Sequence, residues 1–360
     1  MGNSGSDKPE KPCNRRENHL ISIGRKRNFG YLIIGMLLII ILVSNLIIAL
    51  WFNNKLNKIN GNIKSKISLI DDDKKFFDYE GLRDYQENYD STKQYFSYTK
   101  QDLQKQDTVL KDDNGIALTK YKDESRYNPV TISQYGLKQY SNYIETGDNQ
   151  YYDKAKIQAD YLINVQDKET GKFYYDYDFK VSGTNQTLKA PWSSAMAQGQ
   201  VISLLVRIYS ASGDEKYIEA SKLAMKPLTI SVQDGGLKAD FFGYDYYEEY
   251  PTIPESYTLN GFMFTLIGLY DLYNVTGDTQ AQELYNKGIE TLEYCLPFYD
   301  STGISLYHLA HLTDRNLPLH YSESYHTIHI IQLKTLDQIE DNSTFKYYIN
   351  RWEGYVKENS

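Results

Sequence analysis

The sequence predicts an all-α domain made of about four helical hairpins, and a recurring turn is the main evidence. Gly147-Asp148, Gly213-Asp214 and Gly277-Asp278 follow one another at intervals of 66 and 64 residues, and Asp341-Asn342 falls 64 residues further on. An apolar run precedes each turn, and an amphipathic run containing tyrosines follows it. Because Gly commonly ends a helix and Asp or Asn commonly caps the next, each turn is expected to join two antiparallel helices.

The expected first helices are more apolar than the second helices of each pair. The first helices should cover 130–144, 195–211, 259–274 and 326–338, and the second 150–163, 215–226, 279–294 and 343–356. This difference is expected when the first helices form an inner ring and the second an outer, half-wetted ring. We therefore predict an incomplete α/α toroid over residues 126–360.

The segments between the hairpins are long, roughly 30 residues each, and they differ from the helices in composition. Residues 172–179 alternate enough to predict a strand, and residues 235–243 predict a β-hairpin. Long ordered loops at one end of a helical barrel usually line a cleft. A binding site is therefore expected among these loops.

Three further segments precede the predicted toroid. Residues 1–28 form a basic tail, and residues 29–52 are uncharged, rich in Leu and Ile, and aromatic at both ends. A stretch of this length and composition predicts one transmembrane helix that serves as a permanent anchor. Residues 53–125 are polar and predict a stalk without its own core. The excess of Arg and Lys before the span predicts a cytoplasmic amino terminus and an extracytoplasmic domain, at the cell surface or in a secretory lumen.

The charge distribution argues against a nucleic-acid partner. The tail carries a net charge of +4, so with a total of −8 the remainder is about −12. An acidic domain without a basic stripe or a recognition motif is not expected to bind polyanions in general. The two cysteines lie on opposite sides of the predicted span and define no disulfide framework.

Residues able to do acid–base chemistry gather in two regions. Glu249 and Tyr250 lie in a proline-containing loop directly before the apolar segment 259–272, and all histidines except His19 fall between His308 and His329. The histidine spacing is compatible with a metal site, but no H-E-x-x-H pattern is present, and we favour hydrogen-bonding roles in a polar cleft. No P-loop, dinucleotide motif or nucleophile elbow occurs, so neither a metal nor a cofactor is expected.

Several motifs, in order, resemble the carboxy-terminal domain of the D-glucuronyl C5-epimerases. They are Tyr127-Asn128-Pro129, the run from Pro191 to Gln200, Glu248-Glu249-Tyr250-Pro251, Leu259-Asn260-Gly261-Phe262-Met263, Ser305-Leu306-Tyr307-His308-Leu309, and Tyr325-His326-Thr327-Ile328-His329. The resemblance covers roughly residues 127–355. That family has an α/α-barrel catalytic domain, in agreement with the repeat.

The resemblance implies an isomerase that inverts C5 of glucuronate residues in a polysaccharide, by removing a proton and returning one to the opposite face. It implies Glu249, Tyr307 and Tyr325 as the acid–base residues. The residues expected to bind the substrate are Tyr250, Gln198, Asn260, His311, His326 and His329. The expected partners are a uronate-containing polysaccharide and, through residues 29–52, a membrane; the oligomeric state stays open, with a homodimer as one alternative.

The sequence also departs from the family pattern. His308 and Ala310 stand where family members carry Asp and Arg, so a guanidinium that would clamp the substrate carboxylate is lost. Arg315 is the nearest replacement in the sequence. Two alternatives therefore remain beside the epimerase: a uronate polysaccharide lyase, which shares the proton abstraction, and a glycan-binding relative without catalysis.

Overall fold

The computed structural model describes Leu50 and residues 89–96, 109–121 and 124–358. The chain divides into two compact units, residues 1–73 and 74–360, and every described residue except Leu50 belongs to the second. The predicted span 29–52, apart from Leu50, and the basic tail 1–28 lie outside the described residues. Within the described part of the chain, no helix combines the length and apolar character needed to cross a membrane.

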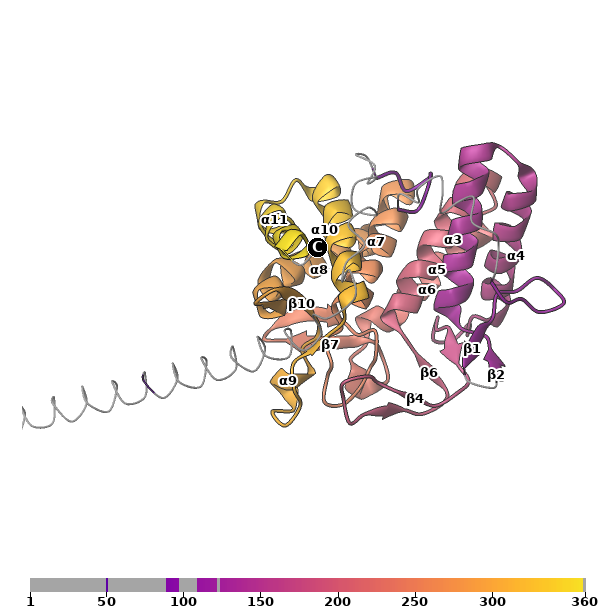
Figure 1. Cartoon of the computed structure of the whole chain (residues 1–360). Coiled ribbons are helices and arrows are strands. Elements are labelled where there is room, and N and C mark those ends of the chain that lie inside the picture. The colour runs from indigo at the N-terminus through magenta and orange to yellow at the C-terminus, as the bar shows by residue number, and fades with distance from the viewer. Residues whose placement is uncertain (1–49, 51–88, 97–108, 122–123, 359–360) are drawn as a thin grey trace, which may run out of the picture. The chain divides into compact units, whose positions relative to one another are not determined.

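Four helical hairpins form the second unit, as the recurring turn predicts. The pairs are α3 (Pro129–Thr146) with α4 (Asn149–Val165), α5 (Ala195–Ser212) with α6 (Lys216–Ala224), α7 (Leu259–Thr276) with α8 (Thr279–Tyr299), and α10 (Glu323–Glu340) with α11 (Ser343–Glu358). The first helices pack on one another in chain order, α3 on α5, α5 on α7 and α7 on α10, and each also packs on its own second helix. Figure 1 shows these helices standing side by side.

The turns end the inner helices in the manner that the sequence predicts. Gly147, Gly213 and Gly277 adopt the left-handed conformation, with φ of 70°, 70° and 69°, and each donates a backbone N–H to the carbonyl four residues earlier. Asp341 takes this role at the fourth turn, with φ of 52°. The side chain of Asp278 then accepts from the first N–H groups of α8.

Within each hairpin the first helix is more buried than the second, which confirms the predicted layering. Nearly all of α5 and α7 is buried, whereas α4 buries only one stripe of residues, Ala155, Gln158, Ala159 and Leu162. The helices α5 and α7 approach so closely that a Cβ on Gly268 would lie 2.2 Å from the carbonyl oxygen of Gly199. A Cβ on Gly199 would lie 2.5 Å from the Cα of Thr265. Only glycine permits this distance between two helix backbones.

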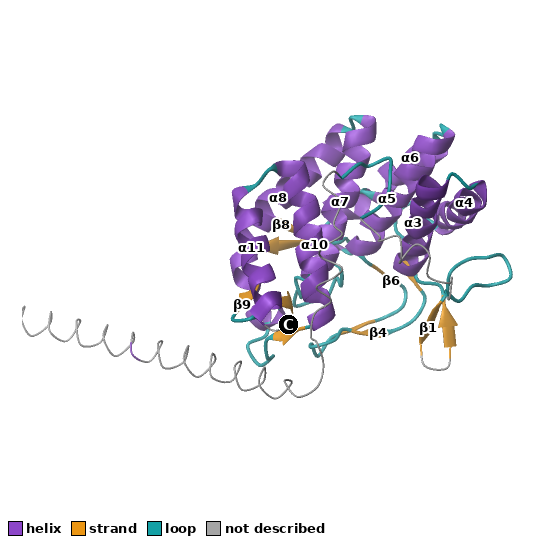
Figure 2. Cartoon of the chain, turned by 45° about the horizontal axis from the view of Figure 1, so that its top comes forward, coloured by secondary structure: helices purple, strands orange, loops and turns teal. Residues whose placement is uncertain are grey.

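The short strands and their loops gather at one end of the helices, as Figures 1 and 2 show. They are β1 (Thr119–Tyr121) paired with β2 (Glu124–Arg126), β3 (Tyr174–Tyr175) with β6 (Trp192–Ser193), β4 (Phe179–Lys180) with β5 (Thr187–Leu188), and β7 (Lys238–Phe241) with β8 (Tyr244–Tyr247). The 3₁₀ turns η2 (Lys226–Thr229) and η3 (Val232–Asp234) precede β7. The prediction that the loops share one end of the barrel is therefore confirmed.

Two details of the loop prediction were wrong. The single strand expected over 172–179 is interrupted, because its first part pairs with β6 and its last residue begins β4, which pairs with β5. The hairpin expected over 235–243 lies a few residues later. Its turn is Phe242-Gly243, with φ of 54° and 94°, and Asp240 accepts from the Gly243 N–H. Two consecutive positive φ angles match the twist of a tight antiparallel hairpin.

The last strands form a three-stranded sheet beneath α10. Its order is β11 (His320–Tyr321), β10 (Ile304–His308) and β9 (Asp300–Ser301), and the short helix α9 (Ala310–Thr313) follows β10. The register between β10 and β11 shifts between Leu306 and His308, so Tyr307 sits at a bulge. A bulge turns a side chain out of the regular alternation of a strand.

Part of the region predicted as a polar stalk packs against the helices. Residues 89–96 lie over the ends of the inner helices opposite the strands (Figure 1), and Tyr95 is buried there. Arg207 of α5 and Asp271 of α7 form a fully buried ion pair of 2.7 Å, and the Tyr89 hydroxyl bonds to both residues. The Arg207 Nε also donates to the Lys93 carbonyl. This ion pair therefore holds residues 89–96 against the two inner helices α5 and α7.

We expect Asp271→Asn to lower the free energy of unfolding by about 3–5 kcal/mol, because it leaves the buried Arg207 charge uncompensated. Urea unfolding of the full chain measures this difference. The matched control is Lys287→Ala, which removes the exposed pair with Glu283 on α8 and should leave the stability nearly unchanged, because water screens an exposed pair. Equal effects of the two substitutions would contradict the role given to the buried pair.

Candidate active site

The loop between β8 and α7 carries the first candidate residues. Ala195 N–H donates to the Glu248 carbonyl, which ties the end of β8 to the start of α5. The Glu248 side chain turns into the protein and accepts from the Tyr257 N–H and the Ser256 hydroxyl. Burial raises the pKa of Glu248 to about 8. Glu248 therefore fixes the end of this loop at Ser256 and Tyr257. Its position beside Glu249 in the sequence did not indicate this role.

Glu249 lies against the first turn of α7 and is only 5 % exposed. A Cβ on Gly261 would fall 2.3 Å from Glu249 Oε2, so the carboxyl group occupies space that any other residue at 261 would fill. Burial raises the pKa of Glu249 to about 7, and hydrogen bonds from Tyr250, the Gly261 amide and Asn260 offset part of the rise. Oε2 is buried without a partner of ordinary hydrogen-bond geometry. A carboxyl group with this pKa exchanges protons near neutral pH.

Three tyrosines from different elements extend from Glu249. The hydroxyl groups of Tyr250 and Tyr307 lie 3.2 Å apart, and the rings of Tyr307 and Tyr325 have centroids 4.7 Å apart. Tyr307 comes from the bulge in β10, and Tyr325 comes from the first turn of α10. Burial raises the pKa of all three phenols. We call Glu249, Tyr250, Tyr307 and Tyr325 the acid–phenol row.

Aromatic packing fixes the first phenol of the row. The Tyr250 ring stacks on Phe179 of β4, at a centroid distance of 5.3 Å and an interplanar angle of 15°. Phe179 in turn stacks on Trp192 of β6. Residues of two short sheets, β4 with β5 and β3 with β6, therefore support Tyr250. The sequence had predicted β3 and β4 as a single strand. Alternation of tyrosines and phenylalanines in 172–179 was the only sequence signal for this support.

The structure brings Glu249, Tyr307 and Tyr325 together, as expected for groups that act on one sugar ring. Glu249 is close enough to both phenols for its charge to raise their pKa values. Tyr250, expected to bind substrate, lies between Glu249 and Tyr307. Asn260 is fully buried beside Glu249. The chemical roles of these residues stay predictions.

The remaining predicted binding residues have structural partners. Gln198 is fully buried, and its side chain bonds to the backbone of Gly171, Phe173 and Ala224. His326 and His329 are also buried, and their Nδ1 atoms both lie 2.8 Å from the Ser305 hydroxyl. Gln198, His326 and His329 are thus enclosed in this structure, as Asn260 is, and their role in binding substrate stays a prediction.

Two further histidines, His308 and His311, follow Tyr307 in the chain. His308 is buried, bonds to the Ser182 carbonyl at 3.0 Å and stacks on His320, and burial lowers its pKa to about 4. His311, on α9, is half-buried, and burial lowers its pKa. Both rings are therefore neutral at pH 7. Among the residues that the structure describes, no group of three or more His, Cys, Asp or Glu side chains is placed to hold a metal ion.

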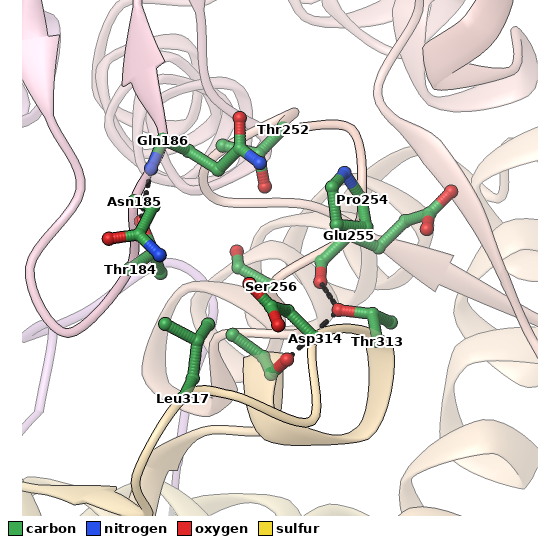
Figure 3. Close-up of a pocket in the computed structure, with 11 residues that line it drawn as sticks. Thr184, Asn185, Gln186, Thr252, Pro254, Glu255, Ser256, Thr313, Asp314 and Leu317 are labelled. Carbon is green, nitrogen blue, oxygen red and sulfur yellow. Dashed lines mark hydrogen bonds between the residues drawn. The ribbon is translucent and has the colours of Figure 1, made fainter.

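A small pocket opens beside the loop that carries Glu249 and Tyr250 (Figure 3). Its lining includes Thr252 and Ser256 of this loop, Thr184 and Gln186 of the segment before β6, and Ala310 with Thr313 of α9. Thr252 is 3 % exposed, and its hydroxyl has no partner. The full lining is Thr184, Asn185, Gln186, Thr252, Pro254, Glu255, Ser256, Ala310, Thr313, Asp314 and Leu317. It is mostly neutral and polar, with two carboxylates, so it suits hydroxyl-rich groups.

A helical-hairpin domain with a buried carboxyl group and a row of phenols at its loop end is a domain equipped for acid–base chemistry. Comparison with known proteins agrees with that class. Residues 166–354 match the family described as the D-glucuronyl C5-epimerase C-terminus, and this chain belongs to that family.

Individual relatives cover different shares of the chain. A D-glucuronyl C5-epimerase of Caenorhabditis elegans is 36 % identical over 210 residues, which are 55 % of this chain and 34 % of that protein, so the chain spans about a third of its length. An uncharacterized protein of Methanocaldococcus jannaschii is 28 % identical over 245 residues, covering 62 % of this chain and 76 % of that protein. Among solved structures, cellobiose 2-epimerase of Bacillus thermoamylovorans has a TM-score of 0.46 at 12 % identity, over 69 % of this chain and 67 % of that one.

We expect the two buried glutamates to make folding less favourable as the pH rises. The pKa values of Glu248 and Glu249 in the folded chain, about 8 and about 7, lie above the usual value of 4.5, so the folded state binds more protons. This contribution is fully present below pH 4.5 and is lost as the pH rises through 7 to 8. Each group changes the free energy of unfolding by up to about 1.4 kcal/mol per pH unit.

Urea unfolding of the wild type and of Glu248→Gln between pH 5 and 8.5 measures the effect of one of these groups. The amide cannot titrate, so the fall in stability with rising pH should be smaller in the variant. Two parallel curves would show that Glu248 has an ordinary pKa.

Proposed function

We propose that this chain is a uronosyl C5-epimerase that inverts C5 of D-glucuronate residues within a polysaccharide. The observation that carries the proposal is the acid–phenol row, in which one carboxyl group and three phenols from three segments meet at the loop end of the domain. Membership of the family and the named C. elegans relative support the reaction and the substrate class. That glucuronate is the reacting sugar is inferred from membership of this family and from the C. elegans relative.

The acid–phenol row contains both a proton acceptor and a proton donor, which this reaction requires. Inversion at C5 removes a proton next to the substrate carboxyl group and delivers one to the opposite face of the ring. One group must accept a proton near neutral pH, and the Glu249 carboxyl, with a pKa of about 7, is suited to this. The other must hold a proton until it is needed, and the Tyr325 phenol, whose pKa burial raises, is suited to that.

The substrate carboxyl group also needs stabilisation as the enolate forms. Ala310, at the position of the family arginine, lines the small pocket described above, and Arg315 lies in the exposed loop after α9. We propose that Arg315 and the neutral hydrogen-bond donors of the pocket, such as Gln186 and Thr252, share this role. The anchor over 29–52, with the domain outside the cytoplasm, is part of the same proposal.

The reaction is tested in deuterated water with heparosan, hyaluronan and chondroitin, three polymers that contain glucuronate. The expected result is deuterium at C5 with unchanged chain length. Shortened chains with an unsaturated, ultraviolet-absorbing end would identify a lyase. Retention of polymer without exchange or cleavage would identify a binding protein. Each of the last two results would overturn the proposal.

Tyr325→Phe should lower the rate of C5 exchange by about 100-fold or more, because it removes only the hydroxyl proton and keeps the ring. The matched control is Tyr347→Phe, at an exposed position on α11, which should exchange at the wild-type rate. Exchange is measured by mass spectrometry of the digested polymer. A Tyr325→Phe rate within about threefold of the wild type would exclude this phenol as the acid.

A further inference from the structure

The turn between β4 and β5 forms part of the small pocket. We call this turn, residues 181–186, the hairpin tip. The Val181 N–H donates to the Gln186 carbonyl, and the Thr184 hydroxyl donates to the Val181 carbonyl. Thr184, Asn185 and Gln186 of the hairpin tip line the pocket (Figure 3). Because these bonds close the turn on itself, a shift of the hairpin tip moves all three lining residues together.

Two imidazole rings lie against the hairpin tip. His308 of β10 is buried, and His320 of β11 stacks on it at a centroid distance of 4.7 Å. A Cβ on Gly183 would lie 2.5 Å from the His320 ring and 2.8 Å from Nε2 of His308. Gly183 also has a φ of 71°, which glycine adopts without strain. The hairpin tip therefore reaches the two rings only with glycine at 183.

Both ring nitrogens of His308 bond to backbone groups. Nε2 donates to the Ser182 carbonyl oxygen at 3.0 Å, and Nδ1 accepts from the Ala310 N–H at 3.3 Å. A carbonyl only accepts and an amide N–H only donates, so these partners fix His308 as the neutral ring with its proton on Nε2. Ser182 belongs to the hairpin tip, and Ala310 begins α9 and lines the pocket. One side chain thus joins two segments of the pocket.

The loop after β8 is held to α9 by other bonds. The Leu309 N–H donates to the Ser256 carbonyl, and the Thr313 hydroxyl donates to the Glu255 carbonyl. Neither bond involves the hairpin tip. Within the residues that the structure describes, His308 makes the one hydrogen bond that joins the hairpin tip to residues 252–256 or 308–317. The place of the hairpin tip in the pocket therefore depends on His308.

We propose that His308 is a positioning residue, which holds the hairpin tip so that Gln186 meets the polymer, and thereby sets the affinity for the polymer without touching it. This inference rests on the proposed function, in which Gln186 helps to bind the substrate carboxyl group. His308 and Ala310 are the two positions at which the chain departs from the family pattern. They are joined by a hydrogen bond, and both serve the same pocket.

The test uses two neutral amides that each keep part of the imidazole's contacts. The longer side chain of His308→Gln can still donate to the Ser182 carbonyl, whereas His308→Asn keeps only the bond from the Ala310 N–H. C5 exchange in deuterated water is measured over a range of concentrations of the polymer that the wild type accepts. His308→Asn should raise KM about tenfold and keep kcat within about threefold, while His308→Gln should keep KM within about threefold.

A second variant moves the hairpin tip and leaves His308 intact. Gly183→Ala places a methyl group against both rings, in a half-buried turn outside the core. It should raise KM by about as much as His308→Asn, again with kcat within about threefold. If both changes act by displacing Gln186, neither should raise KM more than about twofold further in a Gln186→Ala background.

The matched control is Gln158→Leu, on α4. Gln158 is also buried and also joins two backbone groups of a distant segment, since it donates to the Gly115 carbonyl at 2.8 Å and accepts from the Ala117 N–H at 3.0 Å. Urea unfolding should show that Gln158→Leu lowers the free energy of unfolding, as His308→Asn does. Only His308→Asn should change KM.

The outcomes distinguish this inference from the proposed function. Equal rises in KM for His308→Asn and His308→Gln would show that the bond to Ser182 is not what matters, and would overturn the inference. A fall in kcat at unchanged KM would overturn it too, because His308 would then support the neighbouring Tyr307. Effects that multiply with Gln186→Ala would do the same. In each case wild-type exchange leaves the proposed function standing. Absence of exchange in the wild type with all three polymers would overturn the proposed function, and this inference with it.

Discussion

The close contact between α5 and α7 determines where the other parts of the domain can lie. Gly199 and Gly268 bring the two backbones together, and no side chain fits between them. Both helices then begin at the same end of the domain. The segment before α5 supplies β6, and the loop before α7 supplies Glu249. These two segments are joined by the bond from Ala195 to the Glu248 carbonyl. The site is thus a consequence of helix packing as much as of loop structure.

In the acid–phenol row, burial is the largest cause of the shifted pKa values. The Glu249 carboxyl is moved toward neutrality by loss of water, and the phenols are kept protonated for the same reason. His308 and His311 are kept uncharged by burial as well. Both histidines are therefore uncharged neighbours in the chain of the phenol Tyr307.

The helical repeat could be predicted because each turn needs a residue in the left-handed conformation and a helix cap. Both requirements favour particular residue types, as at Gly277 and Asp278. The residues of the site were readable from their motifs, but their neighbours were not. The burial of Gln198, His326 and His329, and their hydrogen bonds to the surrounding protein, could not be predicted from those motifs. The bulge at Tyr307 and the split between β3 and β4 arise from pairing with distant strands, which no local pattern encodes.

The buried ion pair of Arg207 and Asp271 has a consequence for how the domain is held. It fixes residues 89–96 to the ends of the inner helices that lie opposite the loops. An inner helix of 18 residues is about 27 Å long, so this separation is most of the height of the domain. The described chain therefore meets the domain, at residue 89, on the end opposite the acid–phenol row, and residues 89–96 leave the loop end uncovered.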